Sequence, residues 1–210
     1  MGRDGVEGKA IDLNSIWGVG MKLLVNGKVV SEPLTLPFSL SFIRGDGLFE
    51  TILGIDEKII AWQRHYERLA KSAEKLLITI PAKIDIEIGI NQLLKGTVGK
   101  SRIRVAALAD GTWLVIVEAA ENLDKLPSLI KMNQVINSNS PLSGVKSISY
   151  GQSMLAVRTA QARGYSDGLY LNENGDVVET GSANIIILKD RNSSHLPWNQ
   201  AACLELLDKS

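Results

Sequence analysis

The sequence VKSISYGQSMLAVRTAQARGYSDGLYLNENGDVVETGSAN, residues 145–184, decides the fold. It starts beside Lys146 and ends in a small polar turn, residues 180–184, which follows Glu179. Between these two charged residues the apolar pattern changes from the spacing of a helix to the alternation of strands. The stretch therefore predicts a unit in which a lysine and a glutamate flank a helix and a hairpin.

The helical part of this stretch follows Tyr150. Its apolar residues include Met154, Leu155 and Ala162. Gly164 stands where a residue in the left-handed conformation would end the helix.

The hairpin is predicted by an Asn-Gly pair within the turn 172–175. Leu169 and Leu171 alternate with a polar-tipped tyrosine before the turn, and a second short strand at 177–178 leads to the glutamate. The apolar run 185–188 predicts a further, buried strand.

A lysine and a carboxylate in one unit suit a particular chemistry. A lysine amine condenses with aldehydes, and a buried carboxylate holds a pyridine nitrogen protonated, which are two requirements of pyridoxal phosphate (PLP) chemistry. On residue type alone, Lys146 is typical of a solvated surface lysine and Glu179 of a polar strand end. The ordered pattern around them must therefore carry the interpretation.

That pattern resembles the fold-type IV PLP enzymes, which comprise branched-chain and D-amino-acid aminotransferases and aminodeoxychorismate lyase. Three segments carry the resemblance: K-S-I-S-Y at 146–150, M-L-A-V-R-T-A-Q-A-R-G-Y-S-D-G-L-Y-L-N-E-N-G at 154–175, and V-V-E-T-G-S-A-N-I at 177–185. Forty ordered positions are far more specific than a single short motif.

The resemblance implies PLP as the cofactor and assigns roles to residues of this stretch. Lys146 is expected to be the catalytic lysine that binds the cofactor, Glu179 to pair with the pyridine nitrogen, and Tyr150 to hydrogen-bond the phenolic oxygen. The phosphate is expected to be bound by an arginine together with the polar turn: Arg68, Ser182, Ala183 and Asn184.

The first half of the chain carries further blocks of the same family. His65-Tyr66-Glu67-Arg68-Leu69 matches its "His-x-x-Arg-Leu", although the helical spacing alone would place Arg68 on a solvated face. Gly45-Asp46-Gly47 begins a second block that lies near the substrate pocket in relatives, and Phe42 stands where many of them carry a tyrosine. Arg104 corresponds to an arginine of branched-chain enzymes that bears on substrate recognition, and otherwise lies on the exposed face of a strand. The resemblance thus implies substrate contacts at Phe42 and Arg104.

Local patterns also predict the secondary structure of this half. An Asn-Gly turn predicts a hairpin over 22–30, and an Asp-Gly turn predicts another over 103–117. Apolar residues at three- and four-residue steps predict a helix over 62–78, and a second helix is expected over 84–94. The charged segment 118–127 is expected to be a loop.

The composition excludes several classes of function. The 23 basic and 23 acidic residues cancel, so charge gives no case for nucleic acid or a membrane surface as partner. The single cysteine, Cys203, allows no intrachain disulfide and favours a reducing, cytoplasmic location. With only His65 and His195 beside it, no metal site is expected. A Ser-His-Asp site stays open, but no nucleophile elbow is present. No apolar run has the length of a membrane span, and no secretory signal is visible at the start.

The expected fold class is α+β: the two-domain fold of the D-amino-acid aminotransferases, with a small N-terminal α/β domain and an incomplete, larger barrel-like domain. We predict a leader or disordered extension at 1–20, the small domain at 21–120, a linker at 121–127 and a partial PLP-binding domain at 128–210. Relatives continue through a "Cys-Leu-x-Gly-Ile-Thr-Arg" block of which only Cys203-Leu204 is echoed. We therefore expect a C-terminally truncated relative.

Three hypotheses of function follow from the resemblance. The first is a class IV aminotransferase that moves an amino group between a branched-chain-like amino acid and a 2-oxo acid, which Tyr150 favours. The second is a lyase that releases pyruvate from aminodeoxychorismate, which Arg44-Gly45-Asp46-Gly47 and the segment 150–156 also fit. The third is a truncated, non-catalytic relative. The resemblance implies a homodimer.

Overall fold

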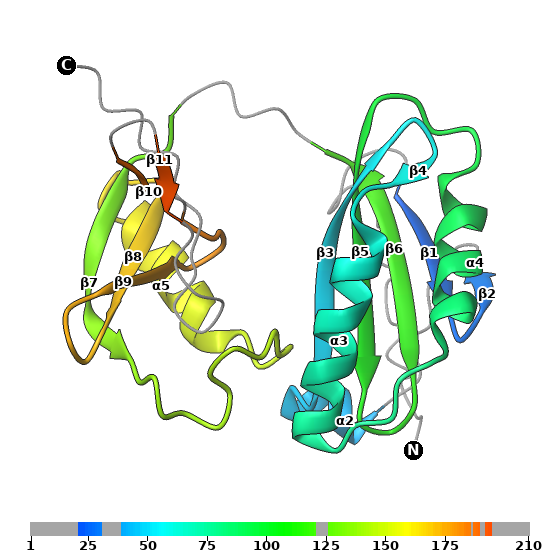
Figure 1. Cartoon of the computed structure of the whole chain (residues 1–210), viewed down its shortest axis with the longest axis horizontal. Helices are drawn as coiled ribbons and strands as arrows, with labels where there is room; N and C mark the ends of the chain where they lie inside the picture. Colours follow the sequence, from blue (N-terminus) through cyan, green and yellow to red (C-terminus); the bar gives the residue numbers. More distant parts are fainter. Residues whose placement is uncertain (1–20, 31–38, 121–125, 186, 190–191, 195–210) are drawn as a thin grey trace, which may run out of the picture. The chain divides into compact units, whose positions relative to one another are not determined.

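The computed structural model describes residues 21–30, 39–120, 126–185, 187–189 and 192–194 (Figure 1). The chain divides into two compact units, Met1–Glu121 and Asn122–Ser210. No helix among the described residues is both long enough and apolar enough to cross a membrane. The tail of the sequence, with His195 and Cys203, lies outside the described residues.

The first unit is built on a six-stranded sheet in the order β2-β1-β6-β5-β3-β4. All neighbouring strands in it pair antiparallel. Its strands are β1 (Lys22–Val25), β2 (Lys28–Val30), β3 (Gly47–Ile55), β4 (Lys58–Ile59), β5 (Lys100–Leu108) and β6 (Trp113–Ala119).

Turn chemistry correctly predicted two hairpins of this sheet, β1–β2 and β5–β6, whereas the hairpin β3–β4 was not predicted. Asn26 and Gly27 have positive φ angles of 46° and 79°, as a two-residue turn between twisted strands requires. Gly111, with φ of 87°, lies in the turn between β5 and β6, which pair antiparallel. One prediction was wrong here: Glu118 and Ala119 belong to β6 and not to a loop, and Glu118 is buried.

Two long helices, α3 (Trp62–Leu76) and α4 (Lys83–Leu94), cover one face of this sheet (Figure 1). Both were predicted from apolar spacing. Leu69 and Ala73 of α3 and Ile86, Ile90 and Leu93 of α4 are among the buried residues that form the core. The short helix α2 (Leu40–Arg44) was not predicted; Gly45, with φ of 65°, ends it in the left-handed conformation just before β3.

The second unit contains a three-stranded sheet in the order β7-β8-β9, from β7 (Leu129–Ile136), β8 (Asp167–Asn172) and β9 (Val177–Thr180). Helix α5 (Gly151–Gln161) connects β7 to β8, which run parallel, while β8 and β9 form the predicted antiparallel hairpin. A small pair, β10 (Ile187–Lys189) and β11 (Asn192–Ser194), follows.

Packing in this unit uses small residues of the helix. Ala156 and Ala160 are the buried residues of α5, whereas Leu155 is 45% exposed and Ala162 is exposed. Ala156 packs with Met132 of β7 and Tyr170 of β8. Of the strand expected at 185–188, Ile187 and Leu188 lie in β10.

Candidate functional site

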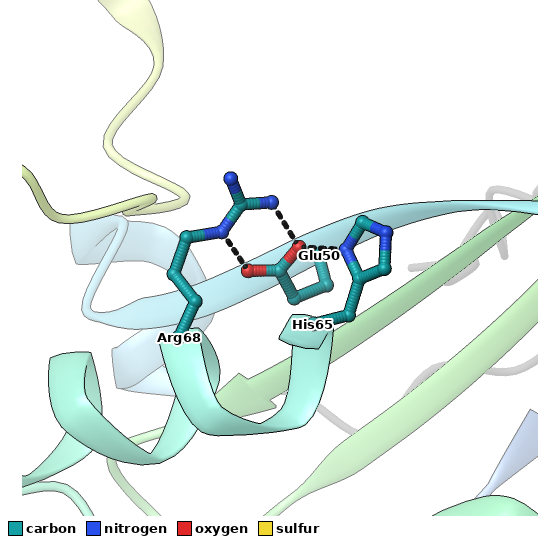
Figure 2. A network of polar contacts seen from close by, with 3 residues as sticks. All are labelled: Glu50, His65 and Arg68. Carbon is teal, nitrogen blue, oxygen red and sulfur yellow. Dashed lines mark hydrogen bonds and ion pairs between the residues drawn. The ribbon is translucent and has the colours of Figure 1, made fainter. Parts of the chain in front are cut away.

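A buried ionic network lies between β3 and α3 in the first unit. Glu50 is 1% exposed and points from β3 towards the helix, where it meets Arg68 and His65 (Figure 2). Arg68 Nε donates to Glu50 Oε1 at 2.6 Å and Arg68 Nη2 donates to Glu50 Oε2 at 2.5 Å. His65 Nδ1 lies 2.9 Å from Glu50 Oε2. Because His65 and Arg68 are three residues apart on α3, one turn of the helix presents both to the same carboxylate.

Charge and burial oppose each other in this network. Burial by itself raises the pKa of Glu50, but the hydrogen bonds and positive charges of Arg68 and His65 outweigh it, so the pKa lies below its ordinary value. The hydrogen bond to Glu50 in turn raises the pKa of Arg68. Glu50 is therefore held as a carboxylate that accepts a two-pronged pair from the arginine.

In the second unit, Lys146 and Tyr150 come just before α5. Lys146 is partly buried, and Tyr150 is the N-cap residue of the helix. A hydrogen bond from Ser149 N–H to Ser147 Oγ at 3.1 Å and one from Tyr150 N–H to the Ile148 carbonyl at 2.7 Å make this segment a tight turn. The turn fixes the position of the Lys146 backbone relative to the start of α5.

Glu179 lies on β9, opposite Tyr170 of β8, and is partly buried. Burial raises its pKa, and the positive charge of Lys146 lowers it only in part. The lysine and the glutamate, 33 positions apart, therefore act on each other electrostatically within one unit. Among the residues that the structure describes, none donates a hydrogen bond to the Glu179 carboxylate.

The turn after Glu179 is ordered by side chains of the same unit. Ser182 donates its N–H and its hydroxyl to Asp167 Oδ2, at 2.9 and 2.7 Å. Ala183 N–H donates to Thr180 Oγ1 at 2.9 Å. Two of the predicted phosphate-binding residues thus already have internal acceptors for these donors.

The predicted residues divide between the units. Arg68 and the two predicted substrate residues belong to the first unit. Phe42 is on α2 and 59% exposed. Arg104 is on β5 with its Nε 3.8 Å from Glu118 Oε1, which also accepts from Arg102 Nε at 2.7 Å. The second unit holds the other predicted residues: Lys146, Tyr150, Glu179, Ser182, Ala183 and Asn184.

Sequence reasoning missed the burial of three carboxylates, Glu50, Glu118 and Asp167. Glu50 shares the inward side of β3 with the buried Leu48 and Ile52, and Asp167 is the buried first residue of β8. A charged residue at an inward position of a strand is a signal of a satisfied polar network, because an unpaired charge there would be costly. Among the described residues, no group of three or more His, Cys, Asp or Glu side chains is placed to hold a metal ion.

The chain is similar in sequence to known aminotransferases. Residues 47–203 match the family model described as amino-transferase class IV. The chain is 22% identical over 200 residues to a probable branched-chain-amino-acid aminotransferase of Rickettsia bellii, covering 84% of this chain and 67% of that protein. It is also 22% identical over 205 residues to a bifunctional aminodeoxychorismate lyase and D-amino acid transaminase of Mycobacterium tuberculosis, covering 81% and 67%.

Solved structures confirm the predicted fold class. A hypothetical aminotransferase from Mycobacterium tuberculosis in a PLP-bound form superposes with a TM-score of 0.74 at 20% identity, covering 85% of this chain and 71% of that chain. The chain therefore spans 67% to 71% of the length of these three proteins.

Proposed function

The chain belongs to the class IV aminotransferase family, and from that premise we propose that it is a PLP-dependent enzyme that moves an amino group between an amino acid and a 2-oxo acid. The proposed amino acid is of the branched-chain kind. Small amino acids and oxo acids are then its partners in the reaction, and a homodimer in the cytoplasm is its proposed state.

The electrostatic coupling of Lys146 and Glu179 is the observation that carries the proposal. PLP joins a lysine amine at one end of its ring and needs a carboxylate at the pyridine nitrogen. Glu179 has a raised pKa and no hydrogen-bond donor among the described residues, so a protonated ring nitrogen would supply the donor that its carboxylate lacks. These residues fit the cofactor.

Each residue then has a definite task. When bound, PLP supplies an aromatic ring that accepts the electrons released at the substrate α carbon. Lys146 binds the cofactor through its amine and, once displaced by the substrate, takes and returns a proton as base and acid. Glu179 accepts the hydrogen bond of the ring nitrogen and keeps it protonated, and Tyr150 donates to the phenolic oxygen.

The turn residues Ser182, Ala183 and Asn184 are proposed to bind the phosphate. The family resemblance gives Arg68 a phosphate-binding role, and a guanidinium suits a phosphate because its planar donors match phosphate oxygens. In the first unit, Arg68 pairs with Glu50 through Nε and Nη2. A serine hydroxyl donates only one hydrogen bond, so the Ser182 side chain reaches a phosphate only by leaving Asp167.

Absorbance tests the proposal directly. The purified 210-residue protein mixed with PLP should gain a band near the visible edge, and borohydride should fix the cofactor to one peptide, which contains Lys146. Lys146→Ala should lose both signals. Lys131→Ala is the matched control, because Lys131 is an exposed lysine on β7 of the same unit. A band that survives in Lys146→Ala would refute the assignment.

Substrate contacts are proposed at Phe42 and Arg104.

Half-reactions test the proposed substrate class. Adding one D- or L-amino acid at a time, without an acceptor 2-oxo acid, should change the absorbance spectrum of the PLP-loaded protein. We expect L-leucine, L-isoleucine and L-valine to be the most effective. Conversion by a D-amino acid but by none of these three would contradict the branched-chain proposal.

A lyase is the second candidate, since one relative is named as both an aminodeoxychorismate lyase and a transaminase. The two reactions differ in their need for a second substrate. Release of pyruvate from aminodeoxychorismate without an acceptor 2-oxo acid would favour the lyase, and strict dependence on an acceptor would favour the transaminase.

A non-catalytic relative is the third candidate, because the chain spans about two thirds of the length of the curated relatives described above. Gel filtration and dialysis separate it from the enzymes. A folded protein that retains no PLP after dialysis would favour this reading, and a dimer that retains PLP would favour an enzyme.

A further inference from the structure

Asp167 is a buried carboxylate, 6% exposed, to which the proposed mechanism gives no task. We propose that Asp167 is a positioning residue: it fixes the backbone of the turn after Glu179, and so holds Glu179 and the backbone of Ser182 in place for the cofactor. This inference rests on the proposed function. It concerns how the fold orders the cofactor site, and it can be measured in the protein without cofactor.

Asp167 accepts four hydrogen bonds, three of which come from two residues of the turn. Oδ2 accepts from the N–H and the hydroxyl of Ser182, at 2.9 and 2.7 Å. Oδ1 accepts from Gly181 N–H at 3.1 Å and from Gly168 N–H at 2.7 Å. A carboxylate has room for about four such bonds, so its capacity is filled.

The turn also lies against the first turn of α5. A side chain at Gly181 would place its Cβ 2.6 Å from the Ser153 carbonyl oxygen and 2.7 Å from Asp167 Oδ1. Only a residue without a Cβ permits this approach. Tyr170, the strand partner of Glu179, donates its hydroxyl to the Gln152 carbonyl at 2.9 Å, which ties the hairpin to the same turn of the helix.

These contacts connect the two halves of the proposed site. Lys146 lies five positions before α5 begins, and Glu179 lies two positions before Gly181. Anchoring the turn to the start of α5 therefore sets where the carboxylate lies relative to the lysine. Asp167 acts on Glu179 through the backbone of the turn.

The test replaces Asp167 by Asn, which keeps the shape and removes the charge. An amide has one oxygen and one NH₂ group, so it satisfies the donors on only one side of the residue. Asp176→Asn is the matched control: Asp176 lies at the other end of the same hairpin and accepts from Asn172 Nδ2 at 3.0 Å. Both variants undergo the same chemical change in the same unit.

The first measurement is amide hydrogen exchange without cofactor. Exchange of the segment 180–183 should become at least about tenfold faster in Asp167→Asn, because the turn loses the anchor that accepts from the Gly181 and Ser182 amides. It should stay at the wild-type rate in Asp176→Asn. Unchanged exchange in Asp167→Asn, or an equal increase in the control, would overturn the proposal.

The second measurement is spectroscopic and uses the loaded protein. Asp167→Asn should move the pH at which the cofactor band changes, because Glu179 would no longer be held at the ring nitrogen, while Asp176→Asn should leave it in place. A role in stability alone would not move this midpoint. Faster exchange with an unmoved midpoint would overturn the positioning role, and a wild-type protein that binds no PLP would instead refute the proposed function.

A second variant keeps the proposal testable if Asp167→Asn does not fold. Ser182→Ala removes only the hydroxyl contact at 2.7 Å and leaves the backbone contact of the same residue to Asp167. It should accelerate exchange in the segment 180–183 about threefold, and it should move the midpoint in the same direction as Asp167→Asn. No acceleration would overturn the anchoring role.

Discussion

Glu50 and Glu179 are two partly or fully buried glutamates in strands, and they lie in opposite electrostatic environments. Glu50 is contacted by Arg68 and His65 through close hydrogen bonds, and its pKa is lowered although burial raises it. Glu179 has its pKa raised by burial, with only partial compensation from the charge of Lys146. The first carboxylate is satisfied by its own unit, whereas no hydrogen-bond donor among the described residues satisfies the second.

This difference separates a residue that supports the fold from one that is prepared for a ligand. A carboxylate whose oxygens already accept from neighbouring side chains stabilises the fold, because little accepting capacity is left on it for a ligand. A desolvated carboxylate without a hydrogen-bond donor costs stability, and it recovers that cost when a cationic partner binds. The two glutamates thus mark structural and functional carboxylates in one chain.

The largest effect is expected for Glu50→Ala. The variant should lower the free energy of unfolding of the first unit by about 3 kcal/mol, because it leaves the Arg68 guanidinium partly buried without its carboxylate. Hydrogen exchange with mass spectrometry reports on each unit separately. Glu74→Ala, at an exposed position of α3, is the control and should cost less than about 0.5 kcal/mol.

A smaller loss is expected for Arg68→Lys. Lysine keeps the charge but replaces the two parallel donors with one ammonium group, so the free energy of unfolding of the first unit should fall by roughly 1–2 kcal/mol. Denaturant titration followed by circular dichroism measures it. A variant as stable as the wild type would show that charge alone, and not the fork geometry, holds Glu50.

Glu179→Gln is expected to raise the free energy of unfolding, in contrast to the two variants above. Without cofactor, the variant should be more stable than the wild type by up to about 1 kcal/mol at neutral pH, because it removes a carboxylate whose ionisation burial opposes. It should at the same time weaken retention of PLP through dialysis. A loss of stability comparable with that of Glu50→Ala would abolish the distinction between the two glutamates.

The pH dependence of these two variants sharpens the comparison further. Glu50 has a lowered pKa, so its stabilisation is present above 4.5, the ordinary pKa of a glutamate, and is lost as the pH falls through the lower folded value. The penalty of Glu50→Ala should therefore shrink in acid. Glu179 has a raised pKa, so the cost of ionising it appears as the pH rises through the folded value.

The gain from Glu179→Gln should accordingly vanish below pH 4.5, where the wild-type carboxyl is protonated in both the folded and the unfolded state. Unfolding of both variants and the wild type at pH 4 and pH 7 measures the two trends. A gain for Glu179→Gln that grows in acid would contradict the raised pKa.

Local signals were sufficient for most of the first unit. The Asn26-Gly27 pair fixed one hairpin, and the spacing of apolar residues over 62–78 predicted α3 almost to its ends. The strand β7 was missed because its residues do not alternate in burial and its pairing with β8 joins positions 38 apart, such as Leu129 with Asp167. Parallel pairing through a helix leaves no turn motif in the strand itself.

The sequence by itself determined the family, the fold class, the helices and hairpins set by periodicity and turn residues, and the candidate pair Lys146 and Glu179. Only the tertiary structure showed which buried carboxylates are satisfied: Glu50 by residues 15 and 18 positions away, and Asp167 by the turn at 181–182. Turn and helix signals are local, because they depend on dihedral angles and near neighbours. Burial and hydrogen-bond partners depend on distant residues that meet only in the folded chain.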